Sequence, residues 1–252
     1  MSTQAPPRNQ LLASLSPHDG EVLHPYLRLV ELTDRAVVIE PGRLDQRVYF
    51  PHSGIISIVA SFSNGQSVDM AMIGRDSVVG VTAALNGEVS RTSAIVRLPG
   101  TASVLDAARL RFAAYEIKQF RDALLRHSEA LSMQIEQSAA CNAVHCLEAR
   151  LARRLLRMRD LSGDDTLYGT QELLADMLGV QRNSVSIIAK AFQDAKLIHY
   201  CRGMIEIVNL EGLRARACEC YRAIEMHYQR LSQNEPQGDE EREFERGRRS
   251  DG

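Results

Sequence analysis

The sequence contains no run of about eighteen apolar residues, the length that a membrane-spanning helix requires. Its first nine residues also lack the apolar segment of a secretory signal peptide. We therefore expect a chain that makes no membrane contact and stays in the cytoplasm.

A strong excess of one charge is missing as well, since 30 Lys and Arg residues stand against 32 Asp and Glu residues. This balance argues against a protein that binds nucleic acid over its whole surface. By segment, only residues 148–232 carry more Lys and Arg than Asp and Glu, 13 against 11. One basic face in that segment would suffice to contact phosphates.

Disulfide staples are not expected either. The chain has an odd number of cysteines, and its 252 residues are enough for one large or two modest domains. A hydrophobic content of 44% and a charged content of 25% are ordinary for a globular protein, so we expect free thiols. The cysteines are Cys141, Cys146, Cys201, Cys218 and Cys220.

Short β-branched stretches separated by Gly and Pro turns fill the first half of the chain. This pattern indicates a small antiparallel barrel or sandwich. Asn64-Gly65 favours a two-residue hairpin turn because both residues tolerate a positive φ. We expect helices at 10–15 and 20–29, then strands at 35–39, 47–51, 54–61, 68–73, 94–98 and 102–105.

Strand signals stop near residue 107, and helical periodicity follows. We expect a helix over 107–126, a long helix that Ser128 caps, and further helices at 147–156 and 212–231. One face of the long helix begins apolar and becomes small or polar, which fits pairing with a second copy in a symmetric dimer. Packing against its own domain is the alternative. This face consists of Leu131, Ile135, Ser138, Asn142 and His145, with Asn142 as a register-setting contact.

Residues 170–198 predict two short helices joined by a tight turn. Apolar residues recur at helical spacing up to Leu178, and Gly179 supplies the left-handed conformation that ends a helix. The apolar face resumes from Val185 to Phe192. Four consecutive polar residues, 181–184, lie between the two faces. They suit a helix in the major groove, because Arg pairs with guanine and Asn or Gln with adenine. An ordinary helical hairpin with a solvated turn is the alternative.

Two further strands are expected directly behind these helices, at 197–200 and 204–208, about the turn Cys201-Arg202-Gly203. A hairpin in this place is a wing, which favours the DNA-binding interpretation. Residues 1–9 and 233–252 hold little that is apolar, and we expect a loose tail and a disordered tail.

The order of β-roll, long helix and winged helix-turn-helix resembles the Crp/Fnr family of bacterial transcription regulators. The resemblance covers roughly residues 10–222. It lies in Val48-Tyr49-Phe50 with Ser53-Gly54, in the leucine pattern of 148–156, and in Thr170-Gln171-Glu172-Leu173 through Arg182 and Val185 to Leu197-Ile198. The implied α+β fold has a cyclic-nucleotide-binding-like antiparallel β-roll at 10–127, a dimerisation helix at 128–147, a winged helix-turn-helix at 148–222 and a tail at 233–252.

The resemblance implies a homodimer that binds double-stranded DNA with two-fold-related half-sites, each recognition helix, 181–192, in one major groove. RNA polymerase would be a partner if the protein activates transcription. Family members often carry Arg, Glu and Arg at the positions of Arg182, Asn183 and Ile187, so we expect a different operator here. The expected DNA contacts are Thr170, Gln171, Gln181, Arg182, Asn183, Ser184, Ser186, Lys190 and Arg202.

Family members that bind a cyclic nucleotide hold its ribose with a Glu and its phosphate with an Arg. Here Val81 stands in place of that Glu, and Arg91 is displaced by one residue, which in a strand turns a side chain to the opposite face. We therefore expect no tight cyclic nucleotide binding and no other cofactor, and a β-roll that senses something else or nothing. The candidate effector residues are Gly80, Val81, Arg91, Thr92 and Ser93.

Metal chemistry is not expected. An iron–sulfur cluster needs about four suitably placed cysteines, generally with several near the N-terminus, and none precedes Cys141. Cys218-x-Cys220 lacks a second pair, and we interpret His145 and the thiols near it as inert. Cys201 is the candidate redox-sensitive thiol, because an exposed position near Arg202 favours thiolate.

Two other functions are weighed against DNA binding. The main alternative is a module that binds a cyclic nucleotide or another small ligand and regulates a partner protein through its helices. An enzyme is not expected, because His52, Ser61 and Ser63 lie near one another in the sequence with no carboxylate or glycine elbow to frame them.

Overall fold

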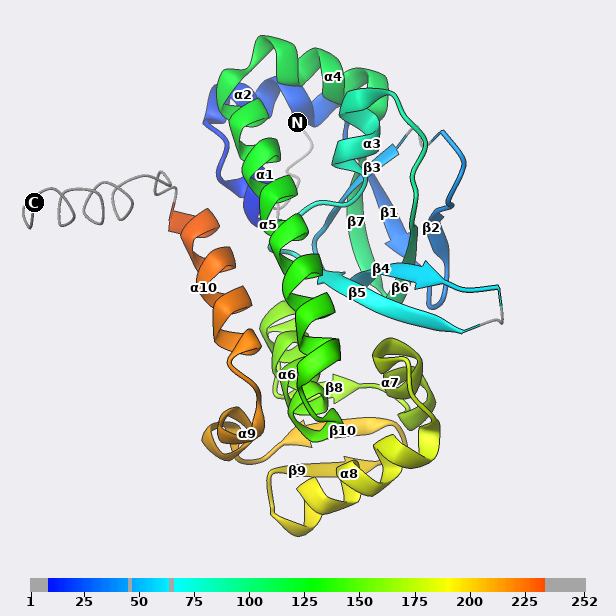
Figure 1. Cartoon of the computed structure of the whole chain (residues 1–252). Helices are drawn as coiled ribbons and strands as arrows, with labels where there is room; N and C mark the ends of the chain where they lie inside the picture. The colour runs from blue at the N-terminus through cyan, green and yellow to red at the C-terminus, as the bar shows by residue number, and fades with distance from the viewer. Residues whose placement is uncertain (1–8, 45–46, 64–65, 234–252) are drawn as a thin grey trace, which may run out of the picture.

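The computed structural model describes residues 9–44, 47–63 and 66–233 (Figure 1). In chain order the elements are α1 (Gln10–Ala13), α2 (Pro17–Leu23), the 3-10 turn η1 (His24–Tyr26), β1 (Arg28–Leu32), β2 (Val37–Ile39), β3 (Arg47–Pro51), β4 (Ile55–Ser61), β5 (Ser67–Ile73), α3 (Val81–Asn86), β6 (Ser93–Leu98), β7 (Gly100–Asp106), α4 (Ala107–Glu116), α5 (Lys118–Val144), α6 (Leu147–Ser162), β8 (Thr166–Tyr168), α7 (Gln171–Leu178), α8 (Arg182–Asp194), β9 (Ile198–Cys201), β10 (Met204–Ile207), α9 (Leu210–Arg216) and α10 (Cys220–Gln233).

The strands of the first half form a β-roll of two antiparallel sheets, with strand orders β1-β7-β3 and β2-β6-β4-β5. Every expected strand is present, with ends that differ by at most two residues from the expected ones. Asn64-Gly65 lies outside the described residues, but β4 and β5 on either side pair antiparallel, with Ser61 opposite Ser67. The antiparallel β-roll is therefore confirmed.

The N-terminal helices are misplaced in the sequence prediction. Ser16-Pro17 was expected to end the first helix, but it begins the second, because the Ser16 hydroxyl accepts the backbone N–H of Asp19 and Pro17 occupies the first turn. The helix expected at 20–29 ends at Leu23, and Leu29 lies in β1 opposite Ser103 of β7. Both β1 and α3 were absent from the prediction.

The long helix α5 begins ten residues earlier than predicted, at Lys118. Ser128 is not its cap, since this residue lies inside the helix and its hydroxyl donates to the Leu124 carbonyl at 2.9 Å. The helix start is set instead by Ile117, whose backbone is extended and whose side chain is buried among the β-roll helices. The same residue ends α4, so the helix expected over 107–126 is two helices.

Most members of the predicted dimer face of α5 make contacts within the chain, and the role of this face in a dimer stays a prediction. Leu131 and Ile135 pack against the β-roll core, Ser138 is buried, and His145 contacts Glu219 of the same chain. Asn142 is exposed. The other exposed residues in the C-terminal half of α5 include Glu136 and a group of small and apolar side chains, namely Ala139, Ala140, Ala143 and Val144.

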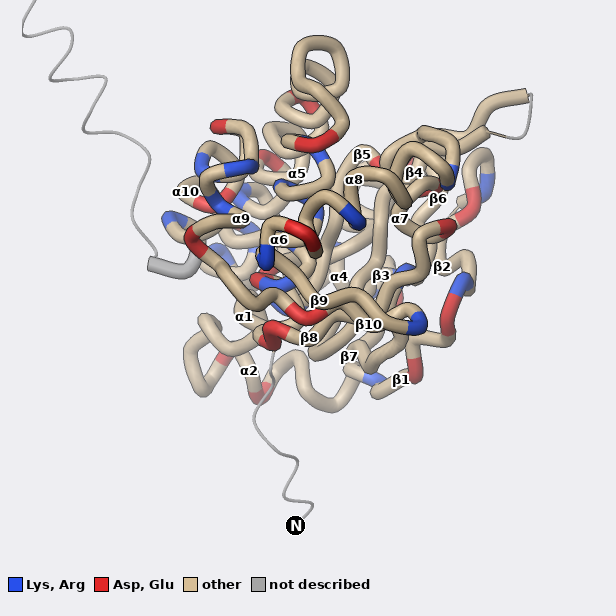
Figure 2. The backbone as a smooth tube through the Cα atoms, turned by 90° about the horizontal axis from the view of Figure 1, so that it is seen from below, with Lys and Arg blue, Asp and Glu red and all other residues tan. Residues whose placement is uncertain are grey.

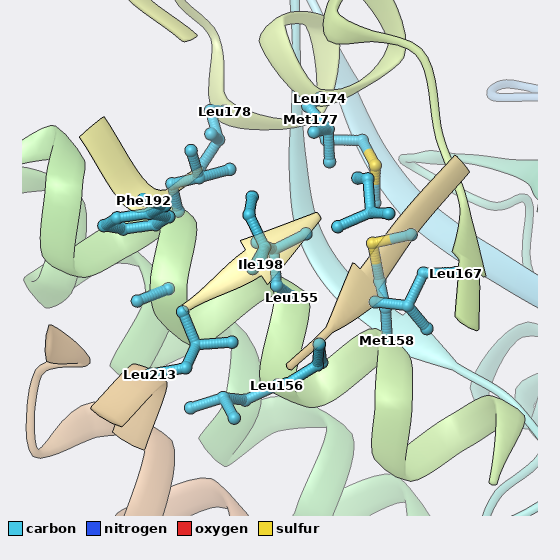
Figure 3. Close-up of a cluster of buried hydrophobic side chains, with 14 of the residues drawn as sticks. Leu155, Leu156, Met158, Leu167, Leu174, Met177, Leu178, Phe192, Ile198 and Leu213 are labelled. Atoms are coloured by element: carbon cyan, nitrogen blue, oxygen red, sulfur yellow. The ribbon is translucent and has the colours of Figure 1, made fainter. Parts of the chain in front are cut away.

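Helix α6 is the first helix of the C-terminal unit. It ends at Gly163, which has a φ of +74°. Its leucines belong to one cluster with the apolar faces of α7, α8, β9 and β10 (Figure 3). This cluster extends to Ile55 of β4 and Met72 of β5, so the C-terminal unit packs directly against the β-roll.

Behind α8 the three strands β8, β10 and β9 form a small antiparallel sheet, in which β8 is an unpredicted member. The single helix expected at 212–231 is two, because Ala217 is extended and ends α9, and Cys218 is buried. Helix α10 then returns along α5 (Figure 1). Among the described residues, no helix is both long and apolar enough to cross a membrane.

Candidate nucleic-acid interface

Helix α7 is anchored at both ends by local chemistry. The hydroxyl of Thr170 accepts the Leu173 backbone N–H at 3.1 Å and caps the first turn. Gly179 ends the helix with a φ of +66°, and its N–H donates to the carbonyls of Ala175 and Asp176. The face between, with Leu174 and other apolar residues, is buried against α6, as Figure 3 shows.

Helix α8 follows after three residues, and its apolar and polar side chains lie on different faces. Val185, Ala189 and Phe192 are buried, as the periodicity predicted. The opposite face is open to solvent: Ile187 is 70% exposed. The predicted recognition residues on the open side are Gln181, Arg182, Asn183 and Lys190, all exposed, with Ser184 and Ser186 partly buried.

Some of the predicted contact residues are already engaged within the protein. Ser186 donates to the Gln171 side-chain oxygen at 2.5 Å and to the Arg182 carbonyl at 3.1 Å. This pair holds the start of α7 against the first turn of α8. Gln171, Ser186 and the Thr170 hydroxyl therefore have positioning roles within the motif.

The wing lies beside the start of α8. Strands β9 and β10 pair with Cys201 opposite Met204, and the turn between them contains Arg202 and Gly203, both with positive φ. Gln193 of α8 accepts the Tyr200 N–H at 2.8 Å, which fixes the wing against the helix. One polar hollow connects these parts. It is lined by Thr170, Gln171, Glu172, Arg182, Gln193, Tyr200, Arg202 and Gly203.

The charge of this face differs from the sequence expectation. Residues 148–232 have 13 basic and 11 acidic residues, but Arg153, Arg154 and Arg157 are buried, which leaves 10 basic residues at least partly exposed. Figure 2 views the molecule from the side of α8 and the wing, and Lys and Arg positions alternate there with Asp and Glu. DNA binding would therefore depend on a few Lys and Arg side chains at specific positions, since this face has no general excess of positive charge.

The β-roll contains a cavity of about 190 Å³ at the position of the candidate effector site. Its walls are mostly apolar or carry hydroxyls, and His127 is the only titratable side chain that the described part of the chain contributes to it. Burial lowers the pKa of His127 to about 4, so this imidazole is neutral near pH 7. The lining residues are Ile39, Ile58, Val78, Gly80, Val81, Thr82, Ala83, Ser90, Thr92, Ala94, His127, Ser128, Leu131, Ser132 and Ile135.

Three of the five candidate effector residues, Gly80, Val81 and Thr92, line this cavity. Ser93 is buried in β6 without lining it, and Arg91 is exposed to solvent. Arg91 precedes β6, so the predicted change of strand face does not apply to it, and no Arg, Lys, Asp or Glu side chain among the described residues lines the cavity. The sequence analysis did not predict that residues of α5 line this cavity, because they reach it only through tertiary packing.

Comparison with solved structures places the fold. A transcriptional regulator of the Crp/Fnr family from Eubacterium rectale aligns over 84% of this chain and 97% of that chain, with a TM-score of 0.63 and 14% identity. FixK2 from Bradyrhizobium japonicum aligns over 76% of this chain and 98% of that chain, with a TM-score of 0.67 and 16% identity. The regulator CLP from Xanthomonas campestris gives a TM-score of 0.61 and 17% identity over 76% of this chain and 99% of that chain. Identities this low show a shared fold.

Sequence models of two families decide the relationship. The cyclic nucleotide-binding domain matches residues 29–114, and the Crp-like helix-turn-helix domain matches residues 149–216. The chain belongs to the Crp/Fnr family. This Crp/Fnr protein is a DNA-binding transcription regulator. A comparison with curated proteins gives no significant match.

Proposed function

We propose that this Crp/Fnr protein is a homodimeric, sequence-specific regulator that places α8 in the major groove of a two-fold-related operator. One observation carries the proposal: Gln181, Arg182 and Asn183 are exposed together at the N-terminal end of α8, where Gln181 is the N-cap residue. Base edges in the major groove are read by such side chains at the N-terminal end of a recognition helix.

The roles follow from side-chain chemistry. Arg182 forks onto guanine and Asn183 pairs with adenine, whereas a Glu at the latter position would accept from cytosine. Ile187, exposed and apolar, suits the methyl group of thymine. Arg202 lines the same hollow as Arg182, beside the start of α7, and we assign it to a phosphate. Lys190 and Ser184 are further phosphate candidates.

The dimer is proposed through α5. Small side chains permit close approach of two helices, and the exposed face of Ala139, Ala140, Ala143 and Val144 provides them on one side of the C-terminal half. Two copies related by a two-fold axis would present two α8 helices, which matches a palindromic site with half-sites about one helical turn apart. A regulator of this kind acts in the cytoplasm, and it contacts RNA polymerase where it activates transcription.

The β-roll cavity supports a sensor that does not take a cyclic nucleotide. A cyclic phosphate carries a negative charge that needs a partner when it is buried, and within residues 9–44, 47–63 and 66–233 no Arg or Lys side chain lines the cavity. The volume of about 190 Å³ is also below the roughly 300 Å³ at which ligand pockets usually begin. We propose that any effector of this cavity is small and uncharged.

Selection of bound sequences from random duplex DNA, with and without cyclic nucleotides, tests the function. We expect an enriched palindrome whose affinity falls steeply with salt and does not respond to cyclic nucleotides. Arg182→Ala should lose about 1 to 3 kcal/mol and relax preference at one base pair, whereas Arg202→Ala should weaken all sequences alike. Arg43→Ala, an exposed change in the β-roll, is the control. No enriched sequence and no salt dependence would favour a small-ligand module acting on a partner protein.

A further inference from the structure

Four side chains with metal-binding atoms meet where the end of α5 faces the junction of α9 and α10. Cys141 and His145 are one helical turn apart on α5, and Cys218 and Cys220 flank Glu219 just before and at the start of α10. The sulfur atoms of these three cysteines and one imidazole nitrogen all lie within 4.8 Å of one another. The sequence argument that Cys218-x-Cys220 lacks a second pair is therefore wrong, because Cys141 and His145 supply it.

The individual distances have the scale of a tetrahedral site. Cys141 Sγ lies 3.5 Å from Cys218 Sγ, and Cys220 Sγ lies 3.5 Å from His145 Nδ1. Ligands about 2.1 to 2.3 Å from a tetrahedral Zn²⁺ are separated by roughly 3.5 to 3.8 Å. The side chains would need to move by only a few tenths of an ångström at these two contacts.

Neighbouring groups orient the ligands as they do around protein metals. The imidazole turns Nδ1 toward Cys220, while its Nε2 lies 3.2 Å from the Glu219 carboxylate. A carboxylate on the far nitrogen of a ligating histidine fixes the tautomer and the ring orientation. Gln137 donates its side-chain N–H to Cys220 Sγ at 3.0 Å, which would stabilise a thiolate.

A buried cation near the cluster has guanidinium nitrogens without a partner in the described part of the chain. Arg153 is 5% exposed, and its Nε and Nη2 have no hydrogen-bond partner among the described residues. Its charge lies close enough to Cys141, a buried thiol of the cluster, to affect that thiol. Three thiolates around a divalent cation carry a net charge of about −1, which would compensate the buried guanidinium.

We propose that Cys141, His145, Cys218 and Cys220 bind Zn²⁺ in a closed tetrahedral site. Three thiolates and one imidazole are a known ligand set of structural zinc, and soft sulfur ligands disfavour Mg²⁺ and Ca²⁺. On binding, Zn²⁺ forms three Zn–S bonds and one Zn–N bond, and the three thiol protons pass to solvent.

The site would couple two functional parts of the regulator. It joins the C-terminal end of α5, which we assign to the dimer, to the segment that immediately follows the winged helix-turn-helix. Bound Zn²⁺ would therefore fix the orientation of the DNA-binding unit on the dimer helix. The site itself depends only on the four ligands, so it can be tested apart from DNA binding.

The test is metal analysis of the full chain purified under reducing conditions, followed by titration of the metal-free protein with Co²⁺ as a spectroscopic probe and with Zn²⁺ against a chelator. We expect about one Zn²⁺ per chain, a thiolate-to-cobalt charge-transfer band and release of up to three protons per metal. Cys141→Ser, Cys218→Ser, Cys220→Ser and His145→Ala should each weaken Zn²⁺ binding strongly. Glu219→Gln should weaken it about 10- to 100-fold.

Matched controls come from the two exposed cysteines, because Cys146→Ser and Cys201→Ser leave the site intact and should bind as the unaltered protein does. If the ligand variants do not fold, the Co²⁺ spectrum and the proton count of the unaltered protein still decide. A spectrum without the thiolate band, or equal metal loss from the control variants, would overturn the proposal.

Discussion

The guanidinium of Arg157 on α6 lies 2.6 Å from the carboxylate of Asp76, in the loop after β5, and both side chains are about nine-tenths buried. Arg157 also lies over the ring of Tyr228 on α10, 4.3 Å from the ring centroid. Beside this pair, Arg154 donates to the backbone carbonyls of Asp69 in β5 and Met177 in α7. Arg154 and Arg157 of the DNA-binding unit thus bind groups of the sensor domain, Asp69 and Asp76, and these contacts connect the packing of the two units.

Removal of Asp76 should destabilise the protein strongly. Asp76→Ala leaves the Arg157 charge buried without its partner, a change that costs about 3 to 5 kcal/mol in other proteins. Chemical unfolding of both proteins would measure the difference. Asp106→Ala is the matched control, because its partner Arg28 is well exposed and such pairs contribute about 0 to 1 kcal/mol. Equal losses in the two variants would show that the buried pair has no special role.

His127 should make the protein sensitive to mild acid. Burial lowers its pKa to about 4 in the folded state, although the Asp76 carboxylate opposes the shift, and Ser77 lies 3.1 Å from its Nδ1. The unfolded chain protonates this imidazole near pH 6.5, so stability present above pH 6.5 is lost as the pH falls toward 4. The expected loss is about 3 kcal/mol.

Unfolding free energies measured between pH 7 and pH 4 would check this. His127→Gln should flatten the decline, whereas the same change at the exposed His199 should leave it as it is. A decline of the same steepness in His127→Gln would assign the acid sensitivity to other groups.

The recognition helix could be predicted because its signals are local. Val185 and Phe192 follow the helical period, and the left-handed glycine at 179 ends the preceding helix whatever the rest of the chain does. The strands of the β-roll from β2 to β7 were predictable for the same reason, since turns at Gly and Pro mark many of their ends, whereas β1 was missed.

The sequence predictions failed where contacts between residues far apart in the chain determine the structure. Helix α5 starts after Ile117 because the side chain of this residue is buried by other helices. The neighbouring sequence contains no signal for this burial. Arg154 and Arg157 look like the polar face of an amphipathic helix in the sequence, but the sensor domain covers them. Cys141 and Cys218 are 77 residues apart, so their contact depends on the return of α10 along α5.

Gly179 should be sensitive to any side chain for two independent reasons. Its φ of +66° strains other residues by about 1 to 2 kcal/mol, and a Cβ there would lie 2.5 Å from Val68 Cγ2 in β5. Gly179→Ala should therefore destabilise the protein by more than the backbone strain alone. In the double variant with Val68→Ala, the loss should be smaller than the sum of the two single losses by about 0.5 to 3 kcal/mol. Additive losses would show that residue 179 and Val68 of β5 are not in steric contact in solution.

Cys201 should be the thiol whose modification affects DNA binding. It is exposed at the end of β9, next to Arg202 in the wing turn, whereas Cys141, Cys218 and Cys220 are buried. Burial also raises the pKa of Cys218 to about 12, which suppresses its thiolate. Alkylation followed by peptide mass analysis should label Cys201 and the other exposed thiol, Cys146, well before the buried three.

A bulky or charged adduct on Cys201 would stand between the wing and the DNA backbone, so oxidation or alkylation should weaken operator binding by about tenfold, near 1.4 kcal/mol. Cys201→Ser should resist this loss and Cys146→Ser should not, because Cys146 precedes α6, away from the wing. Binding assays before and after treatment compare the two variants directly. Equal reactivity of all five thiols, or operator binding that treatment leaves unchanged, would remove the redox role from Cys201.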